Sequence, residues 1–164
     1  MASEHSFDVV SRVDFQEVEN ALNQARKEIG TRYDFRGSDV TITRVKEKIT
    51  VVADDEFRLK AALDILNSKF IRRGVPLKNI EFGKATAALG GRMRQELTIR
   101  SGIPADACKA IVKAIKDAKM KKVQTSIQGD QVRISSKSKD DLQAVIALLK
   151  EKDFGVELQF TNYR

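Results

Sequence analysis

Residues 7–12 read FDVVSR, a run in which apolar and polar side chains alternate with the period of a β-strand. Asp14 follows at a position suited to a helix N-cap, and helical periodicity continues to about Ile29. Residues 96–101, ELTIRS, repeat the strand pattern, and Pro104 then suits the first turn of another helix. A strand followed by a helix therefore occurs twice in this chain.

Each copy continues with two short runs that have the strand period. They are TITRV and ITVVA at 41–45 and 49–53, then VQTSIQ and QVRISS at 123–128 and 131–136. The Gly129-Asp130 pair between the last two runs is a hairpin signal. A second helix follows in each copy, led by Asp54-Asp55 and by Asp140-Asp141, whose carboxylates favour the positive end of a helix dipole.

A last strand closes each copy, with NIEFG at 79–83 and VELQF at 156–160. This order is typical of a ferredoxin-like domain, an antiparallel sheet with two helices on one face and the other face open. We therefore predict an α+β protein formed by tandem duplication of a ferredoxin-like (βαββαβ) domain. Residues 84–95 contain the only Gly-Gly pair and no sustained period, and we predict that they form the linker.

The composition argues against several classes of protein. No apolar run reaches membrane-spanning length, and the N-terminus MASEHSFD does not resemble a signal peptide, so we expect a soluble, cytoplasmic protein with no membrane partner. The single cysteine, Cys108, cannot form an intramolecular disulfide and is predicted to be buried. His5 is the only histidine and lies in a segment predicted to fray, so we predict no metal site and no cofactor.

The positive charge is concentrated in the second half of the sequence. Residues 1–83 contain 14 basic and 14 acidic side chains, whereas residues 84–164 contain 16 and 9, a net charge of +7. Three of the lysines, Lys109, Lys113 and Lys116, share one face of a predicted helix. That face is either a solvated surface or a footprint for an anionic partner such as a phosphate backbone.

The second hairpin presents a polar face. A two-residue turn pairs Ile127 with Val132 and Thr125 with Ile134 on the inward side. The opposite side then carries hydrogen-bonding residues only: Gln124, Ser126, Gln128, Gln131, Arg133 and Ser135. The first hairpin, if it turns at Lys46-Glu47, presents a face of threonines, valines and one lysine. We therefore favour the second sheet as a binding surface, with Arg133 suited to phosphate or guanine edges.

The first copy has about seven extra residues between its first helix and its hairpin. They are TRYDFRG at 31–37, which combine two aromatic rings with two arginines. Such a combination can stack a base and hold its phosphate. Alternatively, Tyr33 and Phe35 plug the seam between two domains from an extended segment, while Arg32 and Asp34 pair at its rim.

Several motifs together resemble the bacterial YajQ family. They are TRYDFRG at 31–37, FIRRGVPLKNI at 70–80, IQGDQVRISSKSKDDLQAVI at 127–146 and LQFTNYR at 158–164. The resemblance implies tandem RNP-like, ferredoxin-like domains with exchanged first strands, covering residues 14–100 and residues 1–13 with 101–164. It also implies nucleotide binding, with nucleic acid (RNA) and a cyclic dinucleotide such as cyclic di-GMP as proposed ligands.

The chain departs from the RNA-recognition motif, which displays aromatic rings on its central strands. The runs ITVVA and QVRISS contain none, so stacking would have to come from Tyr33, Phe35 or Tyr163. Our favoured hypothesis is a non-enzymatic module that binds a nucleotide or nucleic acid. The candidate binding residues are Arg32, Tyr33, Asp34, Phe35, Arg36, Gln128, Arg133, Lys137, Tyr163 and Arg164.

The alternative hypothesis is an adaptor or regulatory protein whose sheet faces bind another protein. A regulatory protein that reads the bound state is likewise a candidate partner under the favoured hypothesis. Catalysis is not expected, because the sequence has no Ser-His-Asp or Cys-His set, no G-x-x-x-x-G-K-[ST] phosphate loop and no G-x-G-x-x-G.

Overall fold

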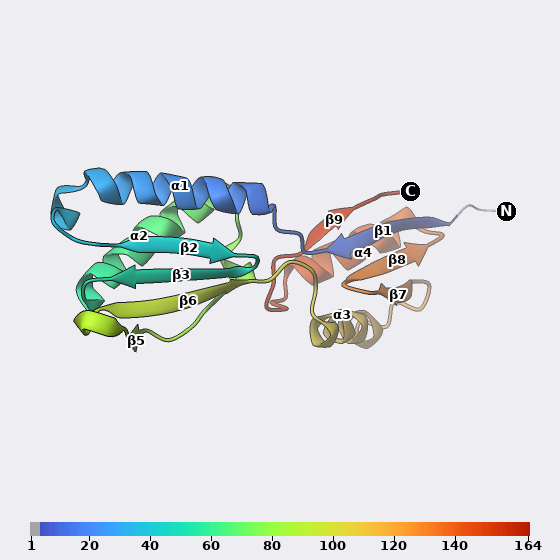
Figure 1. Ribbon diagram of the computed structural model, residues 1–164. Coiled ribbons are helices and arrows are strands. Elements are labelled where there is room, and N and C mark those ends of the chain that lie inside the picture. Colours follow the sequence, from blue (N-terminus) through green and yellow to red (C-terminus); the bar gives the residue numbers. More distant parts are fainter. Residues whose placement is uncertain (1–3) are drawn as a thin grey trace. The chain divides into compact units, whose positions relative to one another are not determined.

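The computed structural model describes residues 4–164, which form two compact units (Figure 1). The central unit is a continuous segment, residues 13–100. The terminal unit combines the N-terminal residues up to Arg12 with residues 101–164. Each unit has its own sheet and its own hydrophobic core.

The central unit contains two long helices, α1 (Phe15–Thr31) and α2 (Glu56–Arg72). Its strands are β2 (Thr41–Val45), β3 (Lys48–Ala53), β4 (Ile80–Phe82), β5 (Thr86–Ala87) and β6 (Met93–Ile99). They pair antiparallel in the order β2-β3-β6-β4, and the short β5 pairs with β6. Short 3-10 turns lie at Tyr33–Phe35, Leu77–Asn79 and Leu89–Gly91.

The terminal unit contains helices α3 (Ala105–Asp117) and α4 (Lys139–Lys150). Its strands are β1 (His5–Val10), β7 (Gln124–Gln128), β8 (Gln131–Ser136) and β9 (Gln159–Thr161). They pair antiparallel in the order β7-β8-β1-β9, and Figure 1 shows β1 beside β8 although they lie at opposite ends of the sequence. Residues 4–164 therefore contain four α-helices and two antiparallel sheets, which confirms the predicted α+β class.

The strand that directly precedes the first helix of each unit lies in the sheet of the other unit. Strand β1 precedes the central unit but pairs with β8 and β9. Strand β6, which contains Leu97, instead pairs with β3 and β4. Residues 84–95 are thus part of the central unit and not a linker, because β5 and the start of β6 lie within them.

The helix starts follow local capping chemistry. The Asp14 carboxylate accepts a hydrogen bond from the Gln16 amide, as predicted, and Asp55 accepts one from Arg58. Helix α4 is capped by the Ser138 hydroxyl, so Asp140-Asp141 lie in the first turn, where their charge still favours the helix dipole. Across residues 4–164, no helix is long and apolar enough to cross a membrane.

Strand β1 contributes the centre of the terminal core. Phe7 and Val9 are fully buried and pack with the inward residues of β8 and helix α3. His5 is the first residue of β1 and pairs with Ser136, so the expectation of a frayed segment is wrong at this position. Ile127 pairs with Val132 as predicted but is 46% exposed, because β7 is an edge strand.

We predict that Phe7→Ala destabilises the terminal unit in particular. The substitution removes a fully buried aromatic ring, which costs about 3 kcal/mol or more in proteins generally. Site-resolved hydrogen exchange should show lost protection in β7, β8 and α4, with the amides of α1 and α2 little affected. Phe57→Ala, at a position that is 77% exposed, is the control and should leave both patterns unchanged. Protection lost first in α1 and α2 would contradict the assignment of β1 to the terminal sheet.

Candidate functional site

An ion pair lies at the centre of the open face of the terminal sheet, the face turned away from α3 and α4. Arg133 on β8 is directly opposite Asp8 on β1. The arginine Nε donates to Asp8 Oδ1 at 2.9 Å, and Nη2 donates to Oδ2 at 3.4 Å. Asp8 is buried, and the Asn162 side-chain amide donates a further hydrogen bond to Oδ2 at 2.8 Å.

These donors determine the charge state of Asp8. The hydrogen bonds from Arg133 lower the pKa of the Asp8 carboxyl below its ordinary value, although burial acts in the opposite direction. The Asn162 hydrogen bond and the charge of Arg164 lower it further. Within residues 4–164, Nη1 of Arg133 has no hydrogen-bond partner. Arg133 is therefore held in position by Asp8 and keeps one edge of its guanidinium available.

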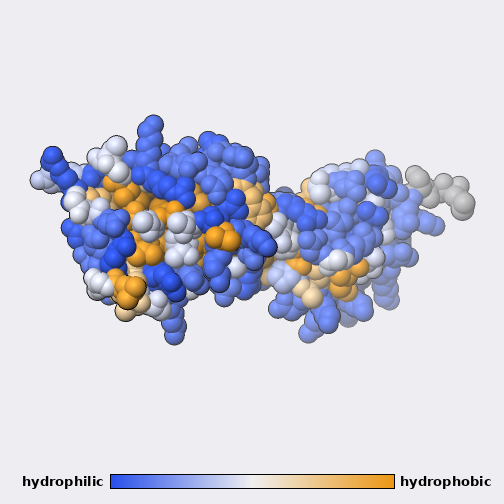
Figure 2. Space-filling model, in the orientation of Figure 1, coloured by the Kyte–Doolittle hydropathy of each residue, from blue (hydrophilic) through white to orange (hydrophobic). Residues whose placement is uncertain are grey.

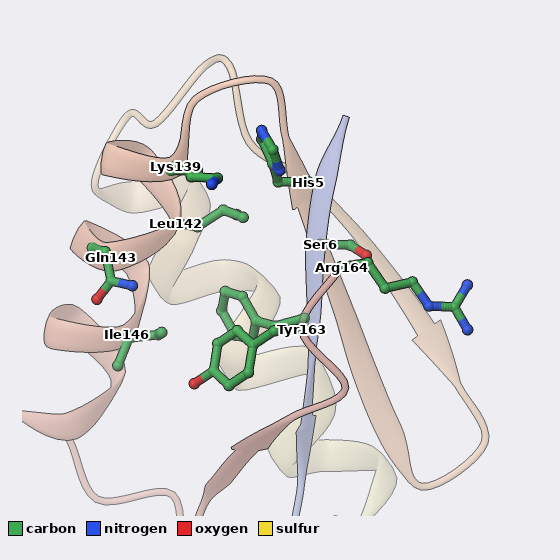
Figure 3. Close-up of a pocket in the computed structure, with 9 residues that line it drawn as sticks. His5, Ser6, Lys139, Leu142, Gln143, Ile146, Tyr163 and Arg164 are labelled. Atoms are coloured by element: carbon green, nitrogen blue, oxygen red, sulfur yellow. The ribbon is translucent and has the colours of Figure 1, made fainter. Parts of the chain in front are cut away.

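A β-bulge at Asn162 brings Arg164 to the same face. Asp8 pairs with Thr161, whereas the Ser6 backbone exchanges two hydrogen bonds with Arg164, at 3.2 and 2.9 Å. Between these two pairs the C-terminal segment therefore has one residue more than β1. Asn162 accommodates the bulge with φ of 57°, a left-handed conformation that asparagine tolerates better than most residues. Figure 3 shows the result: Tyr163 points toward α4, and Arg164 points away from it.

The open face also contains the predicted polar side chains. The β7–β8 register pairs Gln128 with Gln131 and Ser126 with Arg133, as the two-residue turn predicts. Lys137 follows the end of β8 and is exposed. Gln128 and Lys137 thus lie near opposite ends of β8, roughly 20 Å apart at 3.3 Å per residue. Among the predicted terminal-unit residues, the structure brings together Arg133 and Arg164.

The lysines of α3 do not extend this face. Lys109, Lys113 and Lys116 are exposed, as predicted, but α3 packs through Ile111 and Ile115 against the core side of the sheet. The basic helix surface and the arginines are therefore on opposite sides of the terminal sheet.

Charge does not distinguish the two units. The central unit contains 17 basic and 13 acidic side chains, a net of +4, and the terminal unit contains 13 and 10, a net of +3. When the sequence is divided after residue 83, all of the excess positive charge lies in the second half. Residues 84–100 of that half, however, belong to the central unit. The charge argument for the second sheet is therefore weaker in the folded chain than in the sequence.

The open face of the central sheet is more apolar. The hairpin turns at Lys46-Glu47 and presents the predicted threonines and valines, because Thr43 pairs with Thr50 and Thr41 with Val52. Figure 2 shows hydrophobic residues, in orange, among hydrophilic ones over β2, β3 and β6. This composition favours the terminal face over the central face as a phosphate-binding surface.

The TRYDFRG segment belongs to the central unit and forms a 3-10 turn, so the extended conformation we expected is wrong. Phe35 is buried in the core of that unit, whereas Tyr33 is 83% exposed. Arg32 pairs with Asp34 through two hydrogen bonds at 3.0 and 2.8 Å, as predicted, and these bonds lower the pKa of Asp34. The Arg36 guanidinium lies 5.9 Å from the centre of the Tyr33 ring.

A polar hollow adjoins this segment. Its volume is about 330 Å³, and its wall includes Arg26, Arg36, Ser38 and Asp39. The Arg26 Nε donates to the Ile42 carbonyl at 2.9 Å, which fixes its guanidinium at the wall. Of the ring-bearing residues of TRYDFRG, Tyr33 is the one that is exposed for stacking.

The structure gives no support for a metal centre or a reactive thiol. Among residues 4–164, no group of three or more His, Cys, Asp or Glu side chains could hold a metal ion. Cys108 is buried as predicted, and burial raises the pKa of its thiol, which disfavours the reactive thiolate.

The sequence analysis missed two residues that organise the open face, Asp8 and Asn162. The alternation in FDVV does place Asp8 on the face opposite Phe7 and Val9. No local signal assigns Asp8 to Arg133, however, because the two are 125 residues apart. The bulge at Asn162 leaves no clear sequence signature beyond the presence of an asparagine.

Comparison with known proteins agrees with the family resemblance of the sequence motifs. The family model described as "Nucleotide-binding protein YajQ-like" matches residues 5–164. A nucleotide-binding protein of Carboxydothermus hydrogenoformans is 56% identical over 166 residues, covering 100% of both chains. A nucleotide-binding protein of Geotalea uraniireducens is 54% identical over 159 residues, covering 97% of this chain and 98% of the relative.

We predict different roles for the two rings of TRYDFRG. Phe35→Ala should lower the free energy of unfolding by about 3 kcal/mol, because it removes a buried ring from the central core. Tyr33→Ala should change it by no more than about 0.5 kcal/mol, since the ring is exposed. Urea unfolding of both variants measures the difference. Equal destabilisation by the two substitutions would show that Tyr33 is also a structural residue.

We also predict a pH-dependent contribution from Asp8. Its pKa is lower in the folded chain than the ordinary value of 3.8, so the stabilisation is fully present above that value and is lost as the pH falls through the folded pKa. Wild type should therefore be more stable than Asp8→Asn near neutral pH, and the difference should shrink at acidic pH below the ordinary value. Urea unfolding at a series of pH values measures it, with Asp64→Asn, an exposed position in the middle of α2, as control. A difference independent of pH would contradict the ion pair.

Proposed function

This chain belongs to the YajQ-like family of nucleotide-binding proteins, as its motifs predicted, and from that premise we propose that it binds nucleotide phosphates through the open face of the terminal sheet. The observation that carries the proposal is the placement of Arg133 and Arg164 around Asp8. Arg133 is fixed by the buried carboxylate and keeps Nη1 for a phosphate oxygen. A guanidinium fixed in this way loses less conformational entropy on binding than a mobile one.

Arg164 supplies the second cation of the face. Its guanidinium makes no ion pair or hydrogen bond to another described residue, and its backbone is fixed by the two hydrogen bonds to Ser6. Serine and glutamine side chains of β7 and β8 lie on the same face as Arg133 and can donate to sugar and phosphate oxygens. The face thus combines two cations with neutral hydrogen-bonding groups.

The ligand classes that fit this face are RNA and a guanine nucleotide such as cyclic di-GMP. Both present phosphates, and a guanine edge also suits the fork-shaped guanidinium of Arg133. Tyr33, stacked with Arg36 on the central unit, is a candidate base-stacking position. The relatives are named for nucleotide binding and not for an enzyme activity, and our proposal is a cytoplasmic binding protein without catalysis.

The proposal includes a duplicated architecture. The two sheets have the same arrangement: a hairpin, then the first strand from the other sequence copy, then the last strand. This repeated order supports two ferredoxin-like, RNP-like domains with exchanged first strands. Their expected bounds are residues 14–100 and residues 1–13 with 101–164.

A second candidate function is that of an adaptor for another protein. It is supported by exposed apolar side chains on the central unit, with Leu89 94% exposed and Val45 73% exposed. A regulatory protein that docks on these residues would bury apolar area, so its binding would depend little on salt. Phosphate binding has the opposite salt dependence.

We predict that Arg164→Ala weakens RNA binding and reduces its dependence on salt. Each lost phosphate contact should make the negative slope of log K against log salt shallower, by about 0.7 for single-stranded RNA and about 0.9 for duplex DNA. Fluorescence anisotropy with a single-stranded RNA, a DNA duplex and labelled cyclic di-GMP, between about 50 mM and 200 mM salt, measures the slope.

The matched control is Lys109→Ala, which removes one positive charge from α3 on the other side of the terminal sheet. It should leave the slope unchanged. An equal effect of both variants would show that only net charge matters, and the absence of any salt-sensitive binding would favour the adaptor. Arg133→Ala is a less suitable test because it would leave the buried Asp8 without its main partner.

A further inference from the structure

A cavity of about 390 Å³ lies on the other side of β1 from the open face, next to α4 (Figure 3). Its floor is apolar and consists of Phe7, Leu142 and Ile146, all of them buried. The volume is within the range of cavities that hold small molecules. Of the candidate surface described above, Arg164 also contributes to the lining of this cavity, although its side chain points away from α4.

Tyr163 forms one wall of the cavity and is held in place from two directions. Its ring centre is 5.9 Å from that of Phe7, with the rings tilted by 35°. The bulge at Asn162 directs the side chain toward α4, and the backbone of Arg164 is bonded to Ser6. The tyrosine nevertheless remains 61% exposed. A fixed aromatic ring with a free face provides a stacking surface for a planar ligand.

The rim of the cavity carries polar groups that are not used within the fold. Lys139 and Gln143 are four residues apart on α4 and share one face of the helix, and His5 stands across from them on β1. None of the three side chains has a hydrogen-bond or ion-pair partner among residues 4–164. The ammonium suits an anion, and the amide can both donate and accept at the edge of a base.

We propose that this cavity binds a nucleoside monophosphate. The base stacks on Tyr163 above the apolar floor, Gln143 bonds to the base edge, and the phosphate is held by Lys139 with His5. The inference rests on the proposed nucleotide-binding function but assigns it a second site, which takes a small nucleotide and not a polymer. The two sites lie on opposite sides of the same strand, β1.

The composition of the chain offers a direct test. The chain has two tyrosines and no tryptophan, so Tyr33→Phe leaves Tyr163 as the sole source of tyrosine fluorescence. We expect AMP and GMP to quench this emission in a saturable manner, after correction for absorption with free N-acetyltyrosinamide. Adenosine and ribose 5-phosphate, which lack the phosphate and the base respectively, should each bind at least about tenfold more weakly.

Substitutions distinguish the parts of the site. Measured by equilibrium dialysis, Tyr163→Ala should weaken AMP binding by at least about tenfold, whereas Tyr163→Phe should retain it. Lys139→Ala should weaken AMP binding but not adenosine binding, and Lys109→Ala should change neither. Circular dichroism melting of each variant checks that it is folded. Unchanged affinity of a folded Tyr163→Ala variant, or no saturable binding of AMP or GMP, would overturn the proposal.

An RNA titration separates this proposal from the first. Lys139 is not on the open face, so Lys139→Ala should leave the RNA affinity and its salt slope unchanged. If RNA binds and responds to Arg164→Ala while mononucleotides do not bind, the cavity proposal fails alone. If AMP binds and RNA does not, the open-face proposal fails alone.

Discussion

The pairing of β1 with β8 and β9 is the constraint on which the terminal unit depends. Its backbone groups find their partners far along the chain, from Val132 opposite Val9 to Thr161 opposite Asp8, and an unpaired buried N–H or C=O would cost free energy comparable to a lost hydrogen bond. The same six residues supply two fully buried core side chains, Phe7 and Val9. They also supply Asp8, the buried carboxylate around which the arginines of the open face are arranged. The fold and the candidate site therefore share one strand.

Much of the local structure could be predicted from the sequence, because local chemistry determines it. The two-residue turns at Lys46-Glu47 and Gly129-Asp130 fix the registers of both hairpins, and the period of two then assigns each side chain to a face. The cap at Asp14 likewise follows from its own neighbours. The pairing of β1 with β8 and of β6 with β3 could not be derived this way, because FDVV and ELTI have similar alternation and either would fit either sheet. Only the family resemblance implied it.

The candidate site was less predictable for the same reason. Arg133 was predicted as a phosphate- or guanine-binding residue of a polar face, but its partner Asp8 comes from β1, 125 residues earlier in the sequence. Tyr163 and Arg164 were both predicted to be binding residues, and the bulge at Asn162 directs their side chains to opposite sides of the sheet. A short segment, Asn162 to Arg164, thus supplies a ring to the cavity beside α4, a cation to the open face and an amide to Asp8. A ligand on one side could therefore influence the other side through three consecutive residues.

The position of β1 also affects the order of events during biosynthesis. The central unit has all its strands once residue 99 has left the ribosome, so it can close while the rest of the chain is still being made. Strand β1 is synthesised before the central unit but has no sheet partner until β8 (Gln131–Ser136) and β9 (Gln159–Thr161) emerge. At roughly 5 to 20 residues per second, this delay is on the order of ten seconds. Throughout that time a nascent strand carrying Phe7 and Val9 is exposed to other chains and to chaperones, because its partner strands follow far behind it in the sequence.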